Sequence, residues 1–285
     1  MLRHRHLSAN GITMHVAEQG EGPLILLLHG FPESWYSWRH QLPALAAAGY
    51  RVVAPDQRGY GTTDRPAEVD QYTIMHLVGD VVGLIDALGE QQAVVVGHDW
   101  GAVVAWNAAL LRPDVVRGVV GVSVPPLPRG FYQNLFQLPG LADAELAKDV
   151  DATFRKIFAG VGEPGLLDAS AAPSTLPDWI TEHELARFVE QFTESGFTGA
   201  VNWYRNLDRN WELTVAWQDV PITPPSLYIA GDRDFVRKLY ALDDAARATV
   251  PSLRGVVDVR GCGHWAQQEC PAVVNRAVLD FVRTL

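Results

Sequence analysis

The sequence predicts an α/β fold in which helices cover both faces of a mostly parallel sheet. Apolar, β-branched runs that end in polar or glycine-rich turns recur along the chain, as strands buried on both faces do. Helical patterns alternate with these runs, which implies parallel pairing. One long stretch lacks strand runs, so a helical cap is expected as an insertion after the first half of the core.

The first half of the core supplies four strand runs. They read "PLILLLHGF", "YRVVAPDQRGYG", "AVVVGHD" and "VRGVVGVSVP" in chain order. Two helical patterns lie among them, "SWRHQLPALAAAG" and "MHLVGDVVGLIDALG", and the first ends at Gly49 and the second at Gly89.

The pattern changes after Pro125. Residues 126–213 hold helical segments rich in aromatic and acidic residues, and the strand pattern then returns with "PSLYIAGDRDF" and "LRGVVDVRGCGH". We therefore expect a core formed by residues 1–125 and 214–285 and a helical cap formed by residues 126–213.

Composition restricts the class of protein. The 285 residues are 48% hydrophobic and 20% charged, which is ordinary for a globular protein with a sizeable core. The formal net charge of −10 and the lack of a basic stripe argue against a nucleic-acid partner. Neither an apolar run of membrane length nor a signal-peptide pattern is seen, so we expect a cytoplasmic protein without a membrane partner. His4 and His6 lack further ligand spacing, so no metal is expected, and a homodimer is left open.

The segment "VVVGHDWGAVVAW" (94–106) has the pattern of a nucleophile elbow. A β-branched run meets a turn between two glycines, and an Ala- and Val-rich helical pattern follows. This turn exposes its central side chain at the top of the sheet, where serine usually stands. Here the residue is Asp99, so the sequence predicts a carboxylate nucleophile.

Four strand-ending turns carry the chemistry. Ligands of such sheets bind beyond the carboxyl ends of the strands, so these turns are expected to meet. Their chain order of nucleophile, acid and histidine is the one expected of an α/β-hydrolase. The turns are "HGFPE" (29–33), "GHDWG" (97–101), "GDRDF" (231–235) and "GCGHW" (261–265).

The chain resembles the α/β-hydrolase-fold epoxide hydrolases, specifically the hydrolase domain of the soluble type, over nearly its whole length. The matching pieces are "HGFPESWYSWR", "GHDWGAVVAW", "YQNLFQLPGLADAEL", "SGFTGAVNWYRNLDRNW", "DFV" and "GCGHW". The elbow and "HGFP" motifs are shared with other hydrolases, and the segment around "NWYRN" is the specific one. The resemblance implies hydrolysis of a small-molecule epoxide by water to a vicinal diol, without a cofactor.

The triad roles make chemical sense. An alkyl electrophile suits Asp99 because the adduct is an ester, which water can open at its carbonyl carbon, whereas an ether on serine would persist. His264 would deprotonate that water, and a second carboxylate would orient the imidazole. Asp232 and Asp234 lie two positions apart, and either could be this second carboxylate. The resemblance places the acid in the "DFV" context, which selects Asp234 and leaves Asp232 to shape the turn.

The remaining site residues stabilise charge or line the cavity. Backbone N–H groups of Phe31 and Trp100 are the expected oxyanion donors, and the resemblance suggests a cis Phe31–Pro32 bond. Opening the epoxide leaves an alkoxide, and the resemblance assigns its protonation to two cap phenols, carried onto Tyr132 and Tyr204. The alternative interpretation is that these tyrosines only pack in the core. The residues expected to line the substrate cavity are His29, Pro32, Trp100, Trp203 and Trp265.

Two other functions stay open at this point. A haloalkane dehalogenase uses the same aspartate, and it binds halide through the following Trp and a second donor, often the Asn of an "HGN" motif. Phe31 replaces that donor here, and the cap offers phenols, which favours an oxygen leaving group. A non-catalytic binding protein of this fold would typically lack a triad member or an acid, whereas this sequence keeps them.

Overall fold

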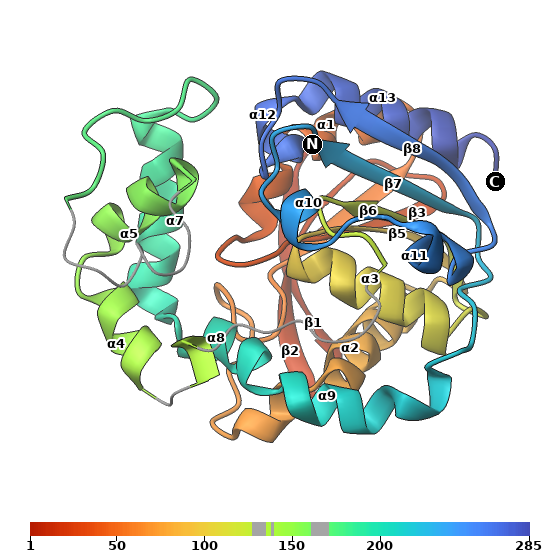
Figure 1. The fold of residues 1–285 in the computed structure, drawn as a ribbon, viewed down its shortest axis with the longest axis horizontal. Coiled ribbons are helices and arrows are strands. Elements are labelled where there is room, and N and C mark those ends of the chain that lie inside the picture. Colours follow the sequence, from red (N-terminus) through yellow and green to blue (C-terminus); the bar gives the residue numbers. More distant parts are fainter. Residues whose placement is uncertain (127–134, 138–139, 161–170) are drawn as a thin grey trace.

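A single mixed sheet organises the molecule. The computed structural model describes residues 1–126, 135–137, 140–160 and 171–285, and in this part of the chain eight strands pair in the order β1-β2-β4-β3-β5-β6-β7-β8 (Figure 1). From β4 to β8 every neighbouring pair is parallel. The strands are β1 (Arg3–Ala9), β2 (Ile12–Gln19), β3 (Leu24–Leu28), β4 (Arg51–Pro55), β5 (Ala93–His98), β6 (Val116–Val122), β7 (Ser226–Gly231) and β8 (Leu253–Val259).

Helices cover both faces of this sheet. α1 (Gln41–Ala47) contacts α13 (Pro271–Val282) on one face, and α2 (Ile74–Ala87) contacts α3 (Trp100–Leu111) on the other (Figure 1). The strands between them are buried on both sides, and all five residues of β3 and all six of β5 are buried. The predicted α/β-hydrolase fold, with a mostly parallel sheet and two helical layers, is therefore confirmed.

The first two strands were not expected from the sequence. β1 and β2 form an antiparallel hairpin, and β2 also runs antiparallel to β4 at the edge of the sheet. β1 has the polar sequence "RHRHLSA", and its first four residues are exposed. An exposed edge strand has little reason to carry the apolar run that marks a buried strand, which is why the pattern missed it.

A helical lobe lies beside the sheet. Within residues 140–160 and 171–214 the described elements are helices: α4 (Leu141–Ala147), α5 (Val150–Phe158), α7 (Glu182–Ser195), α8 (Thr198–Arg205) and α9 (Leu207–Thr214). α4, α5 and α7 stand apart from the strands at the left of Figure 1. Phe154, Phe158, Phe188 and Phe192 fill the space between α5 and α7. The division into a core and a cap at residues 126 and 213 stays a prediction.

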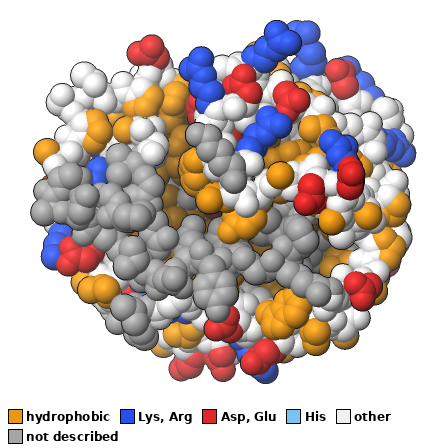
Figure 2. Space-filling view, in the orientation of Figure 1, with side chains coloured by type: hydrophobic (Ala, Val, Ile, Leu, Met, Phe, Trp, Pro, Cys, Tyr) orange, Lys and Arg blue, Asp and Glu red, His pale blue; other side chains and the backbone are white. Residues whose placement is uncertain are grey.

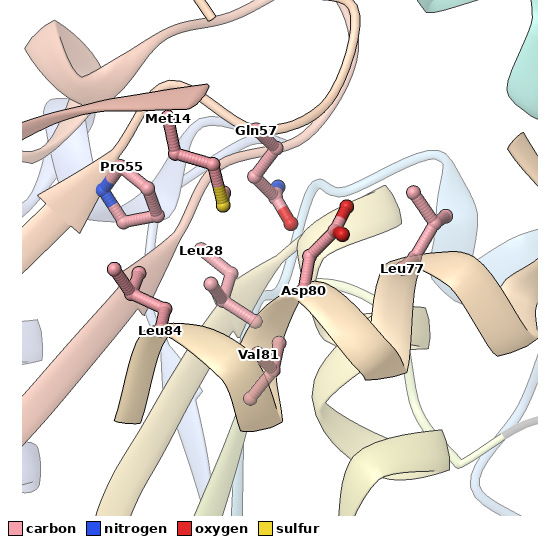
Figure 3. A pocket seen from close by; sticks show the side chains of 8 residues that line it. All are labelled: Met14, Leu28, Pro55, Gln57, Leu77, Asp80, Val81 and Leu84. Carbon is pink, nitrogen blue, oxygen red and sulfur yellow. The ribbon is translucent and has the colours of Figure 1, made fainter. Parts of the chain in front are cut away.

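The layer between the sheet and α2 is closely packed. Its side chains leave a void of only about 10 Å³, lined by Met14, Leu28, Pro55, Gln57, Leu77, Asp80, Val81 and Leu84 (Figure 3). Beside it, Asp80 accepts two hydrogen bonds from the buried Arg58 guanidinium, at 2.5 and 2.8 Å. A space of this size holds no organic substrate, so the chemistry must lie elsewhere.

The surface carries mixed charge. Lys and Arg side chains lie among Asp and Glu side chains on the face shown in Figure 2. Among the described residues no helix is both long and apolar enough to cross a membrane.

Candidate active site

The elbow is a sharp turn between β5 and α3. Asp99 lies between the last residue of β5 and the first of α3, with a φ of 52° in the left-handed region. The two glycines allow this turn because a Cβ on Gly97 would lie 2.0 Å from the Gly101 carbonyl oxygen, and one on Gly101 would lie 2.1 Å from that of Leu28. Strand and helix therefore approach more closely than any side chain would permit.

The two carboxylate oxygens of Asp99 have different surroundings. Oδ1 accepts a hydrogen bond of 2.8 Å from the Phe31 backbone N–H, whereas Oδ2 lies 3.7 Å from His264 Nε2. The side chain is 13% exposed. Burial raises the pKa of Asp99 above its ordinary value, although His264, His98 and the backbone N–H groups of Phe31 and Trp100 oppose that rise.

His264 lies between the two acids. It follows β8 in the turn before α12 (Ala266–Glu269), and its Nδ1 lies 3.1 Å from Asp234 Oδ1. Asp234 follows β7, is buried, and accepts a hydrogen bond of 2.9 Å from the Val236 backbone N–H. Burial would raise the pKa of Asp234, but the proximity of His264 and several hydrogen bonds lower it below the ordinary value, so the group is a carboxylate at neutral pH.

The neighbouring acid has a different contact. Asp232 is exposed, and its Oδ1 accepts a hydrogen bond of 2.8 Å from the Gly261 backbone N–H. Of the two carboxylates in "GDRDF", it is thus Asp234 that lies against the histidine.

Tyr204 lies against the expected oxyanion residues. Its ring on α8 is 5.3 Å from that of Phe31 and 5.1 Å from that of Trp100, both edge to face. The Phe31–Pro32 peptide is cis, as the resemblance suggested. The Tyr204 ring from the helical lobe therefore packs on Phe31, whose N–H binds Asp99, and on Trp100, which follows Asp99 in the chain. The other expected acid, Tyr132, lies outside the described residues.

Comparisons with known proteins show the family of the chain. The alpha/beta hydrolase fold family matches residues 23–271. Epoxide hydrolase A of Mycobacterium tuberculosis is 45% identical over 99% of this chain and 97% of its own length, and Epoxide hydrolase 3 of Siraitia grosvenorii is 40% identical over 99% and 98%. The crystal structure of Epoxide Hydrolase A from Mycobacterium thermoresistibile superposes with a TM-score of 0.94, at 44% identity, covering 99% of this chain and 98% of that one.

The chain belongs to the epoxide hydrolases of the α/β-hydrolase fold.

Of the other residues expected to line the substrate cavity of this epoxide hydrolase, two use their polar side-chain atoms in hydrogen bonds within the protein. His29 is fully buried; its Nδ1–H donates to the Gly30 carbonyl and its Nε2 accepts from the Gln57 N–H. Trp203 Nε1–H donates to the Arg58 carbonyl, and its ring packs on Trp100. These hydrogen bonds indicate that His29 and Trp203 hold the loops of the site.

Pro32 and Trp265 lie next to residues of the predicted site. Pro32 is buried directly after Phe31. Trp265 contacts the His264 ring at 4.7 Å and the Phe158 ring of α5 at 5.3 Å. The ring of Trp265 therefore joins the histidine loop to the helical lobe.

A buried ion pair beside Asp99 and His264 was not predicted from the sequence. His98 and Glu33 are both fully buried, and His98 Nδ1–H donates to Glu33 Oε2 at 2.6 Å. Burial would lower the pKa of His98, but the Glu33 carboxylate raises it to about 9. Burial would likewise raise the pKa of Glu33, but His98 lowers it to about 2. Both groups are therefore charged at neutral pH.

This pair connects the parts of the site. Glu33 Oε2 also accepts from the Gly30 N–H at 2.9 Å, next to Phe31. His98 Nε2–H donates to the His264 carbonyl at 2.9 Å. Both residues stand inside motifs quoted above, "HGFPE" and "GHDWG", but nothing in those letters indicates that the two side chains are buried and meet.

Among the described residues, no group of three or more His, Cys, Asp or Glu side chains could hold a metal ion. The chemistry open to these side chains is nucleophilic attack by a carboxylate followed by base-assisted hydrolysis.

Proposed function

We propose that this protein hydrolyses epoxides to vicinal diols through a covalent ester on Asp99. The observation that carries the proposal is that the two carboxylate oxygens of Asp99 make different contacts. Oδ1 accepts the Phe31 N–H, and Oδ2 faces His264 Nε2 at 3.7 Å. Oδ2 is then the nucleophile, and Oδ1 becomes the carbonyl oxygen of the ester.

The first step opens the epoxide. Asp99 Oδ2 attacks one ring carbon, the carbon–oxygen bond breaks, and the electron pair moves to the departing oxygen. Tyr204 and Tyr132 hydrogen-bond that oxygen and supply the proton that the alkoxide needs. The support for Tyr204 is its ring position against Phe31 and Trp100.

The second step hydrolyses the ester. His264 Nε2 removes a proton from water, and the resulting hydroxide attacks the carbonyl carbon of Asp99. The negative charge that develops on Oδ1 is stabilised by the backbone N–H groups of Phe31 and Trp100. When the tetrahedral intermediate collapses, the bond between the carbonyl carbon and the alkyl oxygen breaks, the departing oxygen takes a proton from the His264 imidazolium, and the diol leaves. The second proton of the water is lost from the re-formed Asp99 carboxyl and restores the phenol that protonated the first alkoxide. Asp234 stabilises the imidazolium throughout.

The role of the helical lobe and the location of the protein are separate parts of the proposal. Residues 126–213 serve as a cap that closes the cavity over Asp99 and brings the phenols. We also propose that the enzyme is cytoplasmic. Sedimentation measurements would show whether it forms a homodimer.

A parallel assay tests the activity. Purified protein is incubated with styrene oxide and, separately, with a bromoalkane of similar size. Diol formation without bromide release supports the proposal. Bromide release without diol would identify a dehalogenase, and the lack of either product would favour a binding protein.

A matched pair of variants tests the nucleophile. Asp99→Ala removes the attacking oxygen and is expected to abolish diol formation. Asp232→Ala removes a carboxylate of the same type from an exposed turn and is expected to leave the rate within about twofold of the wild type. Diol formation above a trace by folded Asp99→Ala protein would contradict the assignment.

A further inference from the structure

Ser123 carries a buried hydroxyl that contacts both Asp234 and His264. It follows the last residue of β6, between the strands that carry Asp99 and Asp234, and it is fully buried. Its Oγ lies 2.6 Å from Asp234 Oδ2 and 2.8 Å from His264 Nδ1. The direct contact between His264 Nδ1 and Asp234 Oδ1 is longer, at 3.1 Å.

The direction of these hydrogen bonds follows from donor counting. A carboxylate only accepts, and a serine hydroxyl has one proton to give. The 2.6 Å contact is therefore Ser123 Oγ–H donating to Asp234, which leaves a lone pair of Oγ facing His264. The Nδ1 of His264 must then carry the proton, which it shares between Asp234 Oδ1 and Ser123 Oγ, and Nε2 is left as the base.

The backbone holds the hydroxyl at this point. Ser123 has a φ of 73°, in the left-handed region that L side chains rarely adopt. The Ser123 N–H donates to the Ile229 carbonyl at 2.8 Å, and the Ser123 carbonyl accepts from the Tyr228 hydroxyl at 2.8 Å. Two bonds to β7 thus fix an unfavourable conformation, and conformations of this kind concentrate at functional sites.

We propose that Ser123 is a positioning residue for ester hydrolysis, whose hydroxyl bridges Asp234 and His264 and keeps the imidazole oriented with its proton on Nδ1. This inference rests on the proposed function, since it concerns the step that needs His264 as a base. When Nε2 accepts a proton from water, Nδ1–H becomes part of a cation and its bond to Oγ strengthens. The hydroxyl therefore acts on hydrolysis and leaves attack by Asp99 unaffected.

Two substitutions remove the hydroxyl with opposite effects on the backbone. Ser123→Ala keeps a Cβ in the left-handed region, whereas Ser123→Gly relieves that strain. Both are expected to slow ester hydrolysis about 10- to 100-fold, the effect of losing one buried hydrogen bond to a charged group. Ser226→Ala is the matched control, because Ser226 is equally buried but its hydroxyl donates to the Pro224 carbonyl.

The measurement separates the two half-reactions. Enzyme in excess is mixed with styrene oxide, quenched, and followed by intact mass as the ester forms and decays. Wild-type rates of formation with slow decay in both Ser123 variants, and an unchanged Ser226→Ala protein, are the expected result. The Nδ1–H proton resonance, assigned by its loss in His264→Gln, should also shift in Ser123→Gly.

Three outcomes would overturn the inference. Decay at the wild-type rate in Ser123→Gly would leave the hydroxyl without a role in hydrolysis. An equal loss in both half-reactions, together with a lowered melting temperature, would mean a purely structural role. Slow ester decay in Ser123→Ala together with faster decay in Ser123→Gly would assign the effect to backbone strain. If instead no ester forms in any protein, His264→Gln included, while diol is produced, the proposed function itself fails.

Discussion

Replacing Glu33 by Gln is expected to destabilise the fold in a pH-dependent way. Glu33 accepts hydrogen bonds from four surrounding donors, namely the Gly30 N–H, His98 Nδ1–H and the side-chain amides of Gln267 and Gln268. The side-chain NH2 of a Gln at this position would face N–H donors, and the His98 cation would be left buried without a counterion.

The magnitude follows from His98. Its pKa is about 9 in the folded protein against an ordinary value of 6.5, and each unit corresponds to about 1.4 kcal/mol. The pairing therefore contributes about 3 kcal/mol, within the range for breaking a buried pair. With an unfolding entropy of about 2.1 cal/mol/K per residue, this lowers the melting temperature of a 285-residue protein by about 5 °C.

The sign of the pH dependence makes the test specific. The pKa of His98 is raised on folding, so its stabilisation is complete below pH 6.5 and is lost as the pH rises through about 9. The pKa of Glu33 is lowered to about 2, so its stabilisation is present above pH 4.5 and is lost as the pH falls toward 2. The gap between wild type and Glu33→Gln should be widest between pH 4.5 and 6.5.

Thermal denaturation from pH 4 to 10 measures that gap. Glu212→Gln is the control, because Glu212 pairs with Arg209 on the surface with both side chains more than half exposed, and little change is expected. A gap that stays constant between pH 6 and 9.5, or one no larger than the control's, would refute the buried ion pair.

Three further predictions concern the chemistry. His264→Gln should be alkylated once and then stall, because attack by Asp99 needs no base; intact mass without a substrate-sized adduct would contradict this. Tyr204→Phe and Tyr132→Phe should each keep partial activity and together nearly lose it, and normal turnover of styrene oxide by the double variant would make both packing residues. The alkylation rate should fall at low pH with a midpoint above 3.8, the ordinary value for Asp, because burial raises the pKa of Asp99. A midpoint at or below 3.8 would argue against Asp99 as the buried nucleophile.

The sequence predicted those parts of the fold that are determined locally. Apolar runs marked β3 to β8, and those of β3 to β7 are mostly buried because a strand covered on both faces must be apolar along its length. β8 is a half-buried edge strand that still carries such a run. The elbow was predictable because Gly97 and Gly101 are required wherever β5 and α3 approach so closely. The hairpin β1–β2 gave no such signal, because β1 is mostly exposed and β2, although mostly buried, has the mixed sequence "ITMHVAEQ".

The missed parts of the site depend on pairing between distant segments. Glu33 and His98 are 65 positions apart, and Ser123 contacts Asp234 across 111 positions. Glu33, His98 and Ser123 stand in quoted stretches, but each letter alone is compatible with a solvated turn. Only the tertiary structure reveals that all three are fully buried and must therefore satisfy their polar atoms internally.

The origin of the oxygen in the first diol tests the central claim most directly. Enzyme in excess completes a single turnover of styrene oxide in water enriched in heavy oxygen. If Asp99 forms an ester, the added diol oxygen comes from its carboxylate, so the first diol should be unlabelled and the label should appear on Asp99. A first-turnover diol that already carries heavy oxygen would mean that water attacks the epoxide directly and that Asp99 acts only as a base.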